Sequence, residues 1–200
     1  MIGASRHARI VMMPAVIRMA VLLNLQFQVL CLWSAEGWLR QPYNRDMAIS
    51  RVRPAQDSDR NALAQMRALL WPDTGVEENL RELDAALSHP MTGTLPMAIL
   101  VSEDENGALI GFLEVGLRSH ADGCDPARPV GFVEGWFVQE QFRNRGIGGG
   151  LMRSAEDWAR AKGCREMASD ALIDNDGSQR AHKALGFDVV DRCVHFRKGL

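Results

Sequence analysis

Tyrosine is almost absent from the sequence, and cysteine is scarce. The single tyrosine is Tyr43, so no tyrosine hydroxyl is available for chemistry in residues 47–200. The chain has four cysteines and no Cys-x-x-Cys pair: Cys31, Cys124, Cys164 and Cys193. This spacing disfavours a zinc site and a disulfide framework, and it fits a reducing compartment. We therefore expect a cytoplasmic protein that holds no metal ion.

The sequence also lacks a long uninterrupted apolar run. A membrane-spanning helix needs about 20 largely apolar residues. The apolar-rich stretch at residues 10–33 is broken by five residues: Pro14, Arg18, Asn24, Gln26 and Gln28. Residues 19–33 are similar to the apolar core of a signal peptide, but no small-x-small cleavage site follows them. We expect no stable membrane association, and a membrane-associated leader is the alternative.

Residues 1–46 differ from the rest of the chain in charge. They hold five arginines, Glu36 and Asp46, a net charge of +3, whereas residues 47–200 hold 18 basic and 23 acidic residues, a net charge of −5. We expect residues 1–46 to be an N-terminal extension outside the fold, with Met47 as the natural start. Residues 47–200 would then form one domain. Mass analysis of the N-terminus of the natural protein tests this hypothesis.

The charge of the whole chain is small as well, at −2. Proteins that bind nucleic acid carry a basic patch or stripe, and this composition indicates none, so we expect no nucleic-acid partner. A mildly acidic body suits a polycationic substrate better than an anionic one.

The most informative stretch that is present runs from residue 132 to residue 159. Its start is rich in aromatic and β-branched residues, which favour a largely buried strand: Phe132, Val133, Trp136, Phe137 and Val138. A polar loop follows at residues 139–144. From Ile147 onward, apolar residues recur at helical spacing, at Leu151, Ala155 and Trp158. The stretch therefore predicts strand, loop and helix.

The junction of that loop and helix carries positive charge and glycine. Its residues are Arg143, Asn144, Arg145, Gly146, Ile147 and Gly148. The first N–H groups of a helix lack partners and carry partial positive charge, and glycines let an anion approach them. Three successive glycines, 148–150, each cost a helix about 1 kcal/mol relative to alanine, so they need a reason. The junction predicts a pyrophosphate seat, and a basic loop with a tight helix entry is the alternative.

Two common nucleotide motifs do not match this junction. No Lys-Ser or Lys-Thr follows the glycines, which disfavours a P-loop, and the glycine order is not Gly-x-Gly-x-x-Gly. Elsewhere, periodicity and turn residues predict strands at 49–53, 96–101, 108–118, 165–170 and, once or twice, within 187–198, and helices at 57–70, 76–88 and 178–185. This order predicts a mixed α/β sandwich.

Arg-x-x-Gly-x-Gly after an apolar strand resembles the GNAT family of acetyl-CoA-dependent N-acetyltransferases. Five further motifs resemble its aminoglycoside 6'-N-acetyltransferase branch, over residues 49–198 in all: Leu-Trp-Pro (70–72), Gly-Cys-Asp (123–125), Val-Glu-Gly (133–135), Gly-Cys-Arg-Glu-Met-Ala-Ser-Asp (163–170) and His-Lys-Ala-Leu-Gly-Phe (182–187). The resemblance implies an α/β fold with a mixed, mostly antiparallel sheet, a splayed central strand pair and helices on both faces. It also implies acetyl-CoA as co-substrate and a homodimer.

The resemblance further implies which residues bind acetyl-CoA. The backbone at Phe137 and Val138 would pair with the pantetheine arm. The pyrophosphate would lie on the junction residues Arg143, Arg145, Gly146, Ile147 and Gly148, and Asn175 and Ser178 match positions near the coenzyme.

Glu134 is the leading candidate for acid–base chemistry. A carboxylate in an apolar strand is costly unless it has a partner or a purpose. Alternation places it on the face of Phe132, Trp136 and Val138. It is either a structural ion pair with an arginine or, as in the resembled family, a base or an anchor for the substrate ammonium.

Three further residues are candidate drug contacts. Asp170 follows a strand, where the resemblance implies a partner for cationic amines; a turn or helix cap is the alternative. Trp71 lies in a helix-breaking stretch and either stacks on a sugar ring or packs as a core or lid aromatic. Asp125 lies in a polar loop, where turn chemistry is the alternative role.

His182 and Trp136 depart from the wider family pattern. His182 stands where many GNAT enzymes carry a tyrosine that protonates the coenzyme thiolate, so it either plays that part or packs. Trp136 stands where a smaller residue is more usual, and it would narrow the acceptor pocket.

The expected function is acetylation of the 6'-amine of aminoglycosides, which confers resistance. A GNAT enzyme for another small amine or a protein amine is the first alternative. A coenzyme-binding or drug-sequestering module without turnover is the second.

Overall fold

The structure, a computed structural model, describes residues 50–194 and 196–199. The proposed extension at residues 1–46 and the proposed start at Met47 lie outside this range. The elements follow in the order β1 (Arg51–Pro54), η1 (Asp57–Asp59), α1 (Arg60–Leu70), α2 (Val76–Ser88), β2 (Met91–Thr92), β3 (Leu95–Glu103), β4 (Leu109–Arg118), β5 (Val130–Val138), η2 (Glu140–Phe142), α3 (Ile147–Ala161), β6 (Met167–Ser169) and α4 (Asp176–Ala184).

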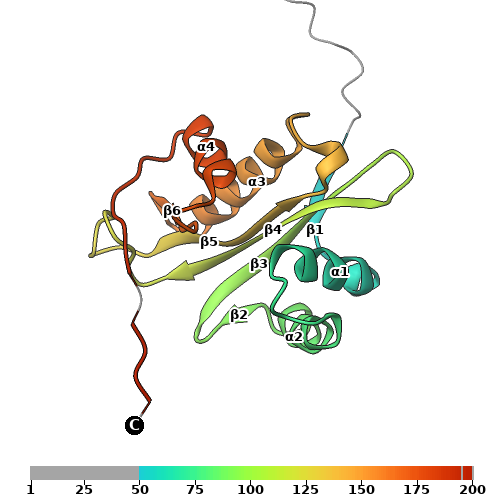
Figure 1. Ribbon diagram of the computed structural model, residues 1–200, viewed down its shortest axis with the longest axis horizontal. Coiled ribbons are helices and arrows are strands. Elements are labelled where there is room, and N and C mark those ends of the chain that lie inside the picture. The colour runs from blue at the N-terminus through green and yellow to red at the C-terminus, as the bar shows by residue number, and fades with distance from the viewer. Residues whose placement is uncertain (1–49, 195, 200) are drawn as a thin grey trace, which may run out of the picture. The chain divides into compact units, whose positions relative to one another are not determined.

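The strands form one sheet in the order β1-β3-β4-β5-β6, and the short β2 pairs with β3 outside that path. Every pairing is antiparallel except that of β5 with β6. Helices α1 and α2 lie on one face of the sheet, and α3 and α4 lie on the other (Figure 1). The expected mixed, mostly antiparallel sheet with helices on both faces is therefore confirmed.

Each face of the sheet has its own apolar core. On one face, α1 and α2 bury Leu63 and Leu83 against Phe112 of β4. On the other face, α3 buries Leu151 and Met152 against β4 and β5. Two of these helices begin directly after a glycine. Gly75 precedes α2 in an extended conformation, and Gly146 precedes α3 with a positive φ of 81°.

Strand β5 is where the sheet opens. Its residues Gly131–Val133 pair with Met167–Ser169 of β6, and from Glu134 onward no strand of the described chain pairs with that edge. The other edge of β5 stays paired with β4 up to Val138. The splayed strand pair implied by the resemblance is thus β5 and β6.

Two local expectations are wrong. Within residues 187–194 and 196–199 the chain forms no strand, because the apolar residues there have no neighbouring strand to pair with. The helix predicted to begin at residue 57 begins at Arg60 instead, because residues 57–59 form a 3₁₀ turn in which Asp59 closes a capping box with Gln56. The helix predicted at 178–185 is found as α4, and Gly186 follows it with a φ of 90°.

Candidate active site

Glu134 lies at a β-bulge in β5. Glu114 of β4 pairs with Gly135 and the next residue, Val115, pairs with Val133, so Glu134 is the extra residue of the bulge. The predicted alternation is wrong at this point. Trp136 and Val138 pack in the core against α3, whereas Glu134 turns to the opposite face, where its carboxylate lies against Gly116. The bulge thus separates Glu134 from the tryptophan two residues later.

The carboxylate of Glu134 has a guanidinium partner. Arg118 of β4 donates two hydrogen bonds to it, from Nε to Oε1 at 3.1 Å and from Nη2 to Oε2 at 2.6 Å. The same guanidinium lies 3.3 Å from the ring centroid of Phe132. Both side chains of the pair reach solvent in part, with 41% of Arg118 and 21% of Glu134 exposed. This cation lies where a substrate ammonium would have to approach the carboxylate.

Trp71 lies beside Glu134, although 63 positions separate them in the chain. It ends α1, and the edge of its indole lies 2.6 Å from where a Cβ on Gly135 would be. No side chain fits between the two, so glycine at position 135 is a steric requirement of this contact. Trp71 also meets Phe112 edge-on, with ring centroids 6.3 Å apart. The structure therefore brings Trp71 and Glu134 together at one place on β5.

A second carboxylate, that of Glu114, is linked to Trp71 through Arg67 and is not among the residues that the sequence predicted. Glu114 is 4% exposed, in the middle of β4. Burial raises the pKa of its carboxyl to about 7; Arg67 acts to lower that pKa, and the charges of Glu82 and Glu134 raise it further. The signal was available, because Glu114 is an acid within an apolar strand, as Glu134 is.

The junction between β5 and α3 forms a concave backbone with free donors. Asn144 and Gly146 have positive φ values of 59° and 81°, and no side chain among the described residues caps the start of α3. The first helical bond is donated by the N–H of Gly150, so the N–H groups of residues 147–149 point out of the helix end. Such a nest of N–H groups fits the pyrophosphate of a coenzyme.

The two arginines of the junction contact different groups. Arg143 donates a hydrogen bond from Nε to the Val138 carbonyl oxygen at 2.9 Å, which fixes the loop to the end of β5. The guanidinium of Arg145 lies 5.6 Å from the ring centroid of Phe142. Phe137 packs on Phe112 with centroids 6.0 Å apart, so this neighbour of Val138 holds the open end of β5 in place.

The three glycines of α3 have different surroundings. A Cβ on Gly148 would lie 2.8 Å from the indole of Trp136, so this position has room only for glycine. At Gly149 and Gly150 the nearest atoms lie 3.4 Å and 3.7 Å away, which is ordinary contact. Packing therefore explains Gly148, and no contact among the described residues requires glycine at positions 149 and 150.

His182 of α4 lies beside β6 and contacts Trp136 of β5. Its Nδ1 is 2.8 Å from the Ser178 carbonyl oxygen, which only accepts, so Nδ1 carries a proton. In the neutral ring, Nε2 then accepts from the Ser169 hydroxyl at 3.0 Å. The ring stands edge-on to Trp136 at a centroid distance of 5.3 Å. His182 is thus held by β6, α4 and Trp136 together.

The remaining candidates near α4 are held by local bonds. Asn175 caps the helix, since its side chain accepts a hydrogen bond from the Ser178 N–H at 3.0 Å. The Ser178 hydroxyl is 3.2 Å from Nδ1 of His182. Asp170 directly follows β6 and is exposed. Because β6 runs parallel to Gly131–Val133, Asp170 emerges at the level of Glu134.

Asp125 lies elsewhere. Its N–H donates to Glu166, which precedes β6, so it lies at the end of β6 opposite Asp170. Its carboxylate accepts from the Ala127 N–H at 2.9 Å and lies 3.5 Å from Arg128. These bonds are the turn chemistry that was the alternative for this residue, and the structure does not bring it to Trp71 and Glu134.

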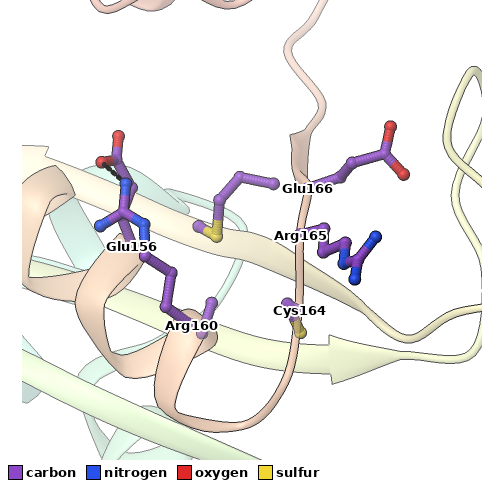
Figure 2. Close-up of a pocket in the computed structure, with 7 residues that line it drawn as sticks. Glu156, Arg160, Cys164, Arg165 and Glu166 are labelled. Atoms are coloured by element: carbon purple, nitrogen blue, oxygen red, sulfur yellow. Dashed lines mark hydrogen bonds and ion pairs between the residues drawn. The ribbon is translucent and has the colours of Figure 1, made fainter.

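A pocket of about 140 Å³ lies at the other end of α3, lined by Glu156, Ala159, Arg160, Cys164, Arg165, Glu166 and Met167 (Figure 2). It includes none of the candidate site residues. Burial raises the pKa of the Cys164 thiol, so this cysteine is a poor nucleophile. The 15 residues of α3 separate this pocket from the helix start by about 20 Å.

No helix in the part of the chain that the structure describes is long and apolar enough to cross a membrane. Nor do His, Cys, Asp or Glu side chains gather anywhere within residues 50–194 and 196–199 in a group of three that could hold a metal ion.

Comparison with known proteins agrees with this geometry. The Acetyltransferase (GNAT) family model matches residues 63–187. The chain therefore belongs to the GNAT acetyltransferase family, as its motifs predicted.

Its relatives belong to one branch of that family. An aminoglycoside N(6')-acetyltransferase type 1 of Klebsiella aerogenes is 38% identical over 149 residues, which cover 74% of this chain and 96% of the relative. The enzyme of the same name from Stenotrophomonas maltophilia is 37% identical, over 74% of this chain and 93% of the relative. The predicted resemblance to the aminoglycoside 6'-N-acetyltransferases is confirmed.

Solved structures of enzymes from the same branch have a similar fold. AAC(6')-Iy in complex with a bisubstrate analogue, CoA-S-monomethyl-acetylneamine, has a TM-score of 0.68 at 32% identity and covers 76% of this chain and 99% of its own. AAC(6')-Ih from Acinetobacter baumannii has a TM-score of 0.67 at 32% identity, with the same coverage.

Proposed function

We propose that this protein transfers the acetyl group of acetyl-CoA to the 6'-amino group of aminoglycoside antibiotics and so confers resistance to them. The observation that carries the proposal is the juxtaposition of Trp71 and Glu134 at Gly135, on a strand whose next residues have an open edge. An aromatic face beside a carboxylate suits an amino sugar. The relatives and the bisubstrate complex support the same acceptor and donor.

The reaction asks little of the protein. The amine nitrogen forms a bond to the thioester carbonyl carbon, the carbon–sulfur bond breaks, the nitrogen loses a proton and the departing thiolate gains one. The enzyme therefore needs a seat for each substrate, an acceptor for the amine proton and a donor for the oxyanion. The open edge of β5 at Phe137 and Val138 supplies backbone groups for the donor substrate.

The N-terminal end of α3 is the proposed seat for the coenzyme pyrophosphate. Its free N–H groups, the positive φ of Gly146 and the charges of Arg143 and Arg145 support this assignment. Ile147 and Gly148 supply two of the N–H groups. Asn175 and Ser178, which bond to each other at the start of α4, are the proposed coenzyme contacts on that helix.

Glu134 is the proposed acceptor of the amine proton or anchor of the ammonium. Because Arg118 binds both of its oxygens, the proton would pass through water or the arginine would move aside. Asp170, exposed at the end of β6, adds negative charge for a second drug amine. Asp125, at the end of β6 opposite Asp170, is proposed to contact a distant part of the drug.

His182 is the proposed candidate for protonating the thiolate, since no tyrosine lies in residues 47–200. Its place beside β6 and Trp136, next to the point where β5 and β6 part, supports this role. Its contact with Trp136 and its three polar contacts to Ser169 and Ser178 support the alternative, a packing role.

The proposal includes an oligomeric state and a cellular location. We expect a cytoplasmic homodimer that binds no nucleic acid, built from one domain at residues 47–200. Apolar side chains at the C-terminal end support the dimer: Val194 is 72% exposed and Phe196 is 93% exposed. A second copy would cover them. The cysteines of the described residues are free, as in a reducing compartment.

A thiol-release assay with acetyl-CoA tests the function directly. Kanamycin, tobramycin and amikacin carry a 6'-amine, paromomycin carries a 6'-hydroxyl, and spermidine represents other amines. We expect turnover with the first three and none with paromomycin. Turnover with spermidine alone would move the function to another amine, and no turnover with any acceptor would favour a module that only binds.

A further inference from the structure

Glu114 is a buried acid to which the proposed reaction gives no part. It lies on the central strand β4, and its Oε1 is 3.1 Å from Nε of Arg67. That contact is an ion pair with poor hydrogen-bond alignment. Three buried polar atoms here have no hydrogen-bond partner among the described residues: Oε1 of Glu114 and Nε and Nη1 of Arg67.

Arg67 links this acid to the acceptor site. Its side chain, 11% exposed, extends from α1, and its Nη2 lies 3.1 Å from Glu82 of α2. Its guanidinium lies 5.2 Å from the ring centroid of Trp71, one helical turn further on. Trp71 in turn lies against Gly135, next to Glu134. One chain of contacts therefore runs from Glu114 through Arg67 to the proposed sugar platform.

We propose that Glu114 is a positioning residue of the acceptor site, which acts through Arg67 to hold the indole of Trp71 against Gly135. This inference rests on the proposed function, because the platform matters only if an amino sugar binds there. Glu114 itself contacts neither substrate in this arrangement.

Stability does not account for a carboxylate at this position. The pKa of Glu114 in the fold, about 7, lies above the ordinary value of 4.5. Its favourable contribution to folding is therefore complete below pH 4.5 and is lost as the pH rises through about 7. Above that pH the protein carries a buried charge with one imperfect partner, which an apolar residue of similar size would avoid. A role in binding explains why the charge is present.

The pairing makes drug binding depend on pH. The charged groups that face Glu114 are Arg67 from α1, Glu82 from α2 and Glu134 from β5. When Glu114 takes up a proton, the attraction that holds Arg67 falls and so does the negative charge behind Trp71. We expect the KM for a cationic aminoglycoside to rise several-fold as the pH falls from 8 to 6, through a step that depends on Glu114.

The first test compares three variants in steady-state kinetics with kanamycin. Glu114→Gln should raise the drug KM about tenfold at pH 8, a loss in line with removing a buried ion pair, while the acetyl-CoA KM stays unchanged. It should also remove the pH-dependent step near 7. Glu114→Asp should recover part of the loss. Glu82→Gln is the matched control, because it removes the exposed partner of the same arginine: the drug KM at pH 8 should change little, and the pH-dependent step should move to lower pH, since the charge of Glu82 raises the pKa of Glu114.

A double-mutant cycle separates positioning from general destabilisation. If Glu114 acts through Trp71, then Glu114→Gln should add little to the drug KM of Trp71→Phe. Effects that add fully, or an unchanged pH profile in Glu114→Gln, would overturn the proposal.

A third measurement covers the case in which Glu114→Gln does not fold. The difference in tryptophan fluorescence between the unmodified protein and Trp71→Phe should change with a midpoint near pH 7. A flat difference would overturn the link between Glu114 and Trp71. If the unmodified protein acetylates no aminoglycoside, the proposed function fails instead, and the fluorescence titration alone decides whether the link exists.

Discussion

Both oxygens of Glu134 accept hydrogen bonds from Arg118, so the carboxylate takes a proton or an ammonium only when that arginine yields or water intervenes. Arg118 is 41% exposed and stacks on Phe132, which lets it swing outward without leaving a buried charge behind. At the scale of single residues, the site thus pairs the Glu134 carboxylate with a half-exposed guanidinium, that of Arg118, which has solvent to move into.

Replacing Glu134 tests its role. Glu134→Gln keeps the shape of the side chain and removes its charge, so kcat/KM for 6'-amino drugs should fall by about 100-fold, the lower range for losing a proton acceptor. Asp170→Asn should weaken drug binding in the same direction. Affinity for CoA, measured by calorimetry, should stay unchanged in both.

Asp157→Asn is a suitable control for the loss of one carboxylate. Asp157 pairs with Arg160 on the exposed side of α3, away from β5, and exposed pairs contribute little. Near-normal turnover in both Glu134→Gln and Asp170→Asn would remove these residues from the site and leave Glu134 as a structural ion pair.

At the scale of elements, the start of α3 serves packing and the coenzyme at once. Gly148 admits the indole of Trp136, and the N–H groups that precede the first helical bond stay free. Gly149 and Gly150 have space for a methyl group, so no contact within residues 50–194 and 196–199 offsets their cost to the helix. Close approach of the coenzyme to this turn would explain them.

A pair of substitutions in α3 separates these roles. Gly148→Ala should destabilise the protein by about 1–3 kcal/mol, because its methyl group overlaps Trp136. Gly150→Ala should stabilise it by up to about 1 kcal/mol, because alanine favours the helix. Urea unfolding measures both.

The same two variants report on the coenzyme. If acetyl-CoA approaches the helix start closely, Gly150→Ala should raise the KM for acetyl-CoA in spite of its greater stability. Equal unfolding free energies for the two variants would contradict the packing role of Gly148.

At the scale of the whole molecule, the residues proposed for binding and catalysis lie within one continuous part of the chain. Every candidate residue falls between Trp71 and His182, and the family model spans residues 63–187. The first strand begins at Arg51. The domain proposed at residues 47–200 therefore contains both substrate seats.

Deleting residues 1–46 tests this organisation. Because no candidate residue lies in that stretch, we expect kcat/KM for kanamycin to stay within about twofold of the full chain, and light scattering to give the mass of a dimer for both. A deleted protein that is folded but inactive would show that residues 1–46 contribute to the fold or the site.

Much of the fold follows from local pattern. The helix at 76–88 coincides with α2, and β4 starts one residue later than predicted and ends where predicted, because helical spacing and turn residues are local signals. The final strands at 187–198 were wrong, because a strand needs a partner and the sequence does not say whether one is adjacent.

The features of the site likewise divide into those that the sequence specifies and those that only the tertiary structure specifies. The basic, glycine-rich junction at residues 143–148 and the cost of an acid at Glu134 are properties of the sequence itself. Which face Glu134 takes is not, because one inserted residue in β5 reverses the alternation, and only the register with β4 reveals it.

The sequence by itself determined the family and the order of the longer strands and the helices from β1 to α4, because periodicity, turn chemistry and short motifs are encoded locally. Only the tertiary structure decided that Arg118 binds Glu134, that Trp71 rests on Gly135 and that Glu114 is buried behind it. Those contacts join residues from separate strands and helices. Their partners are set by sheet register and by the packing of α1 on β4, which no single stretch of sequence specifies.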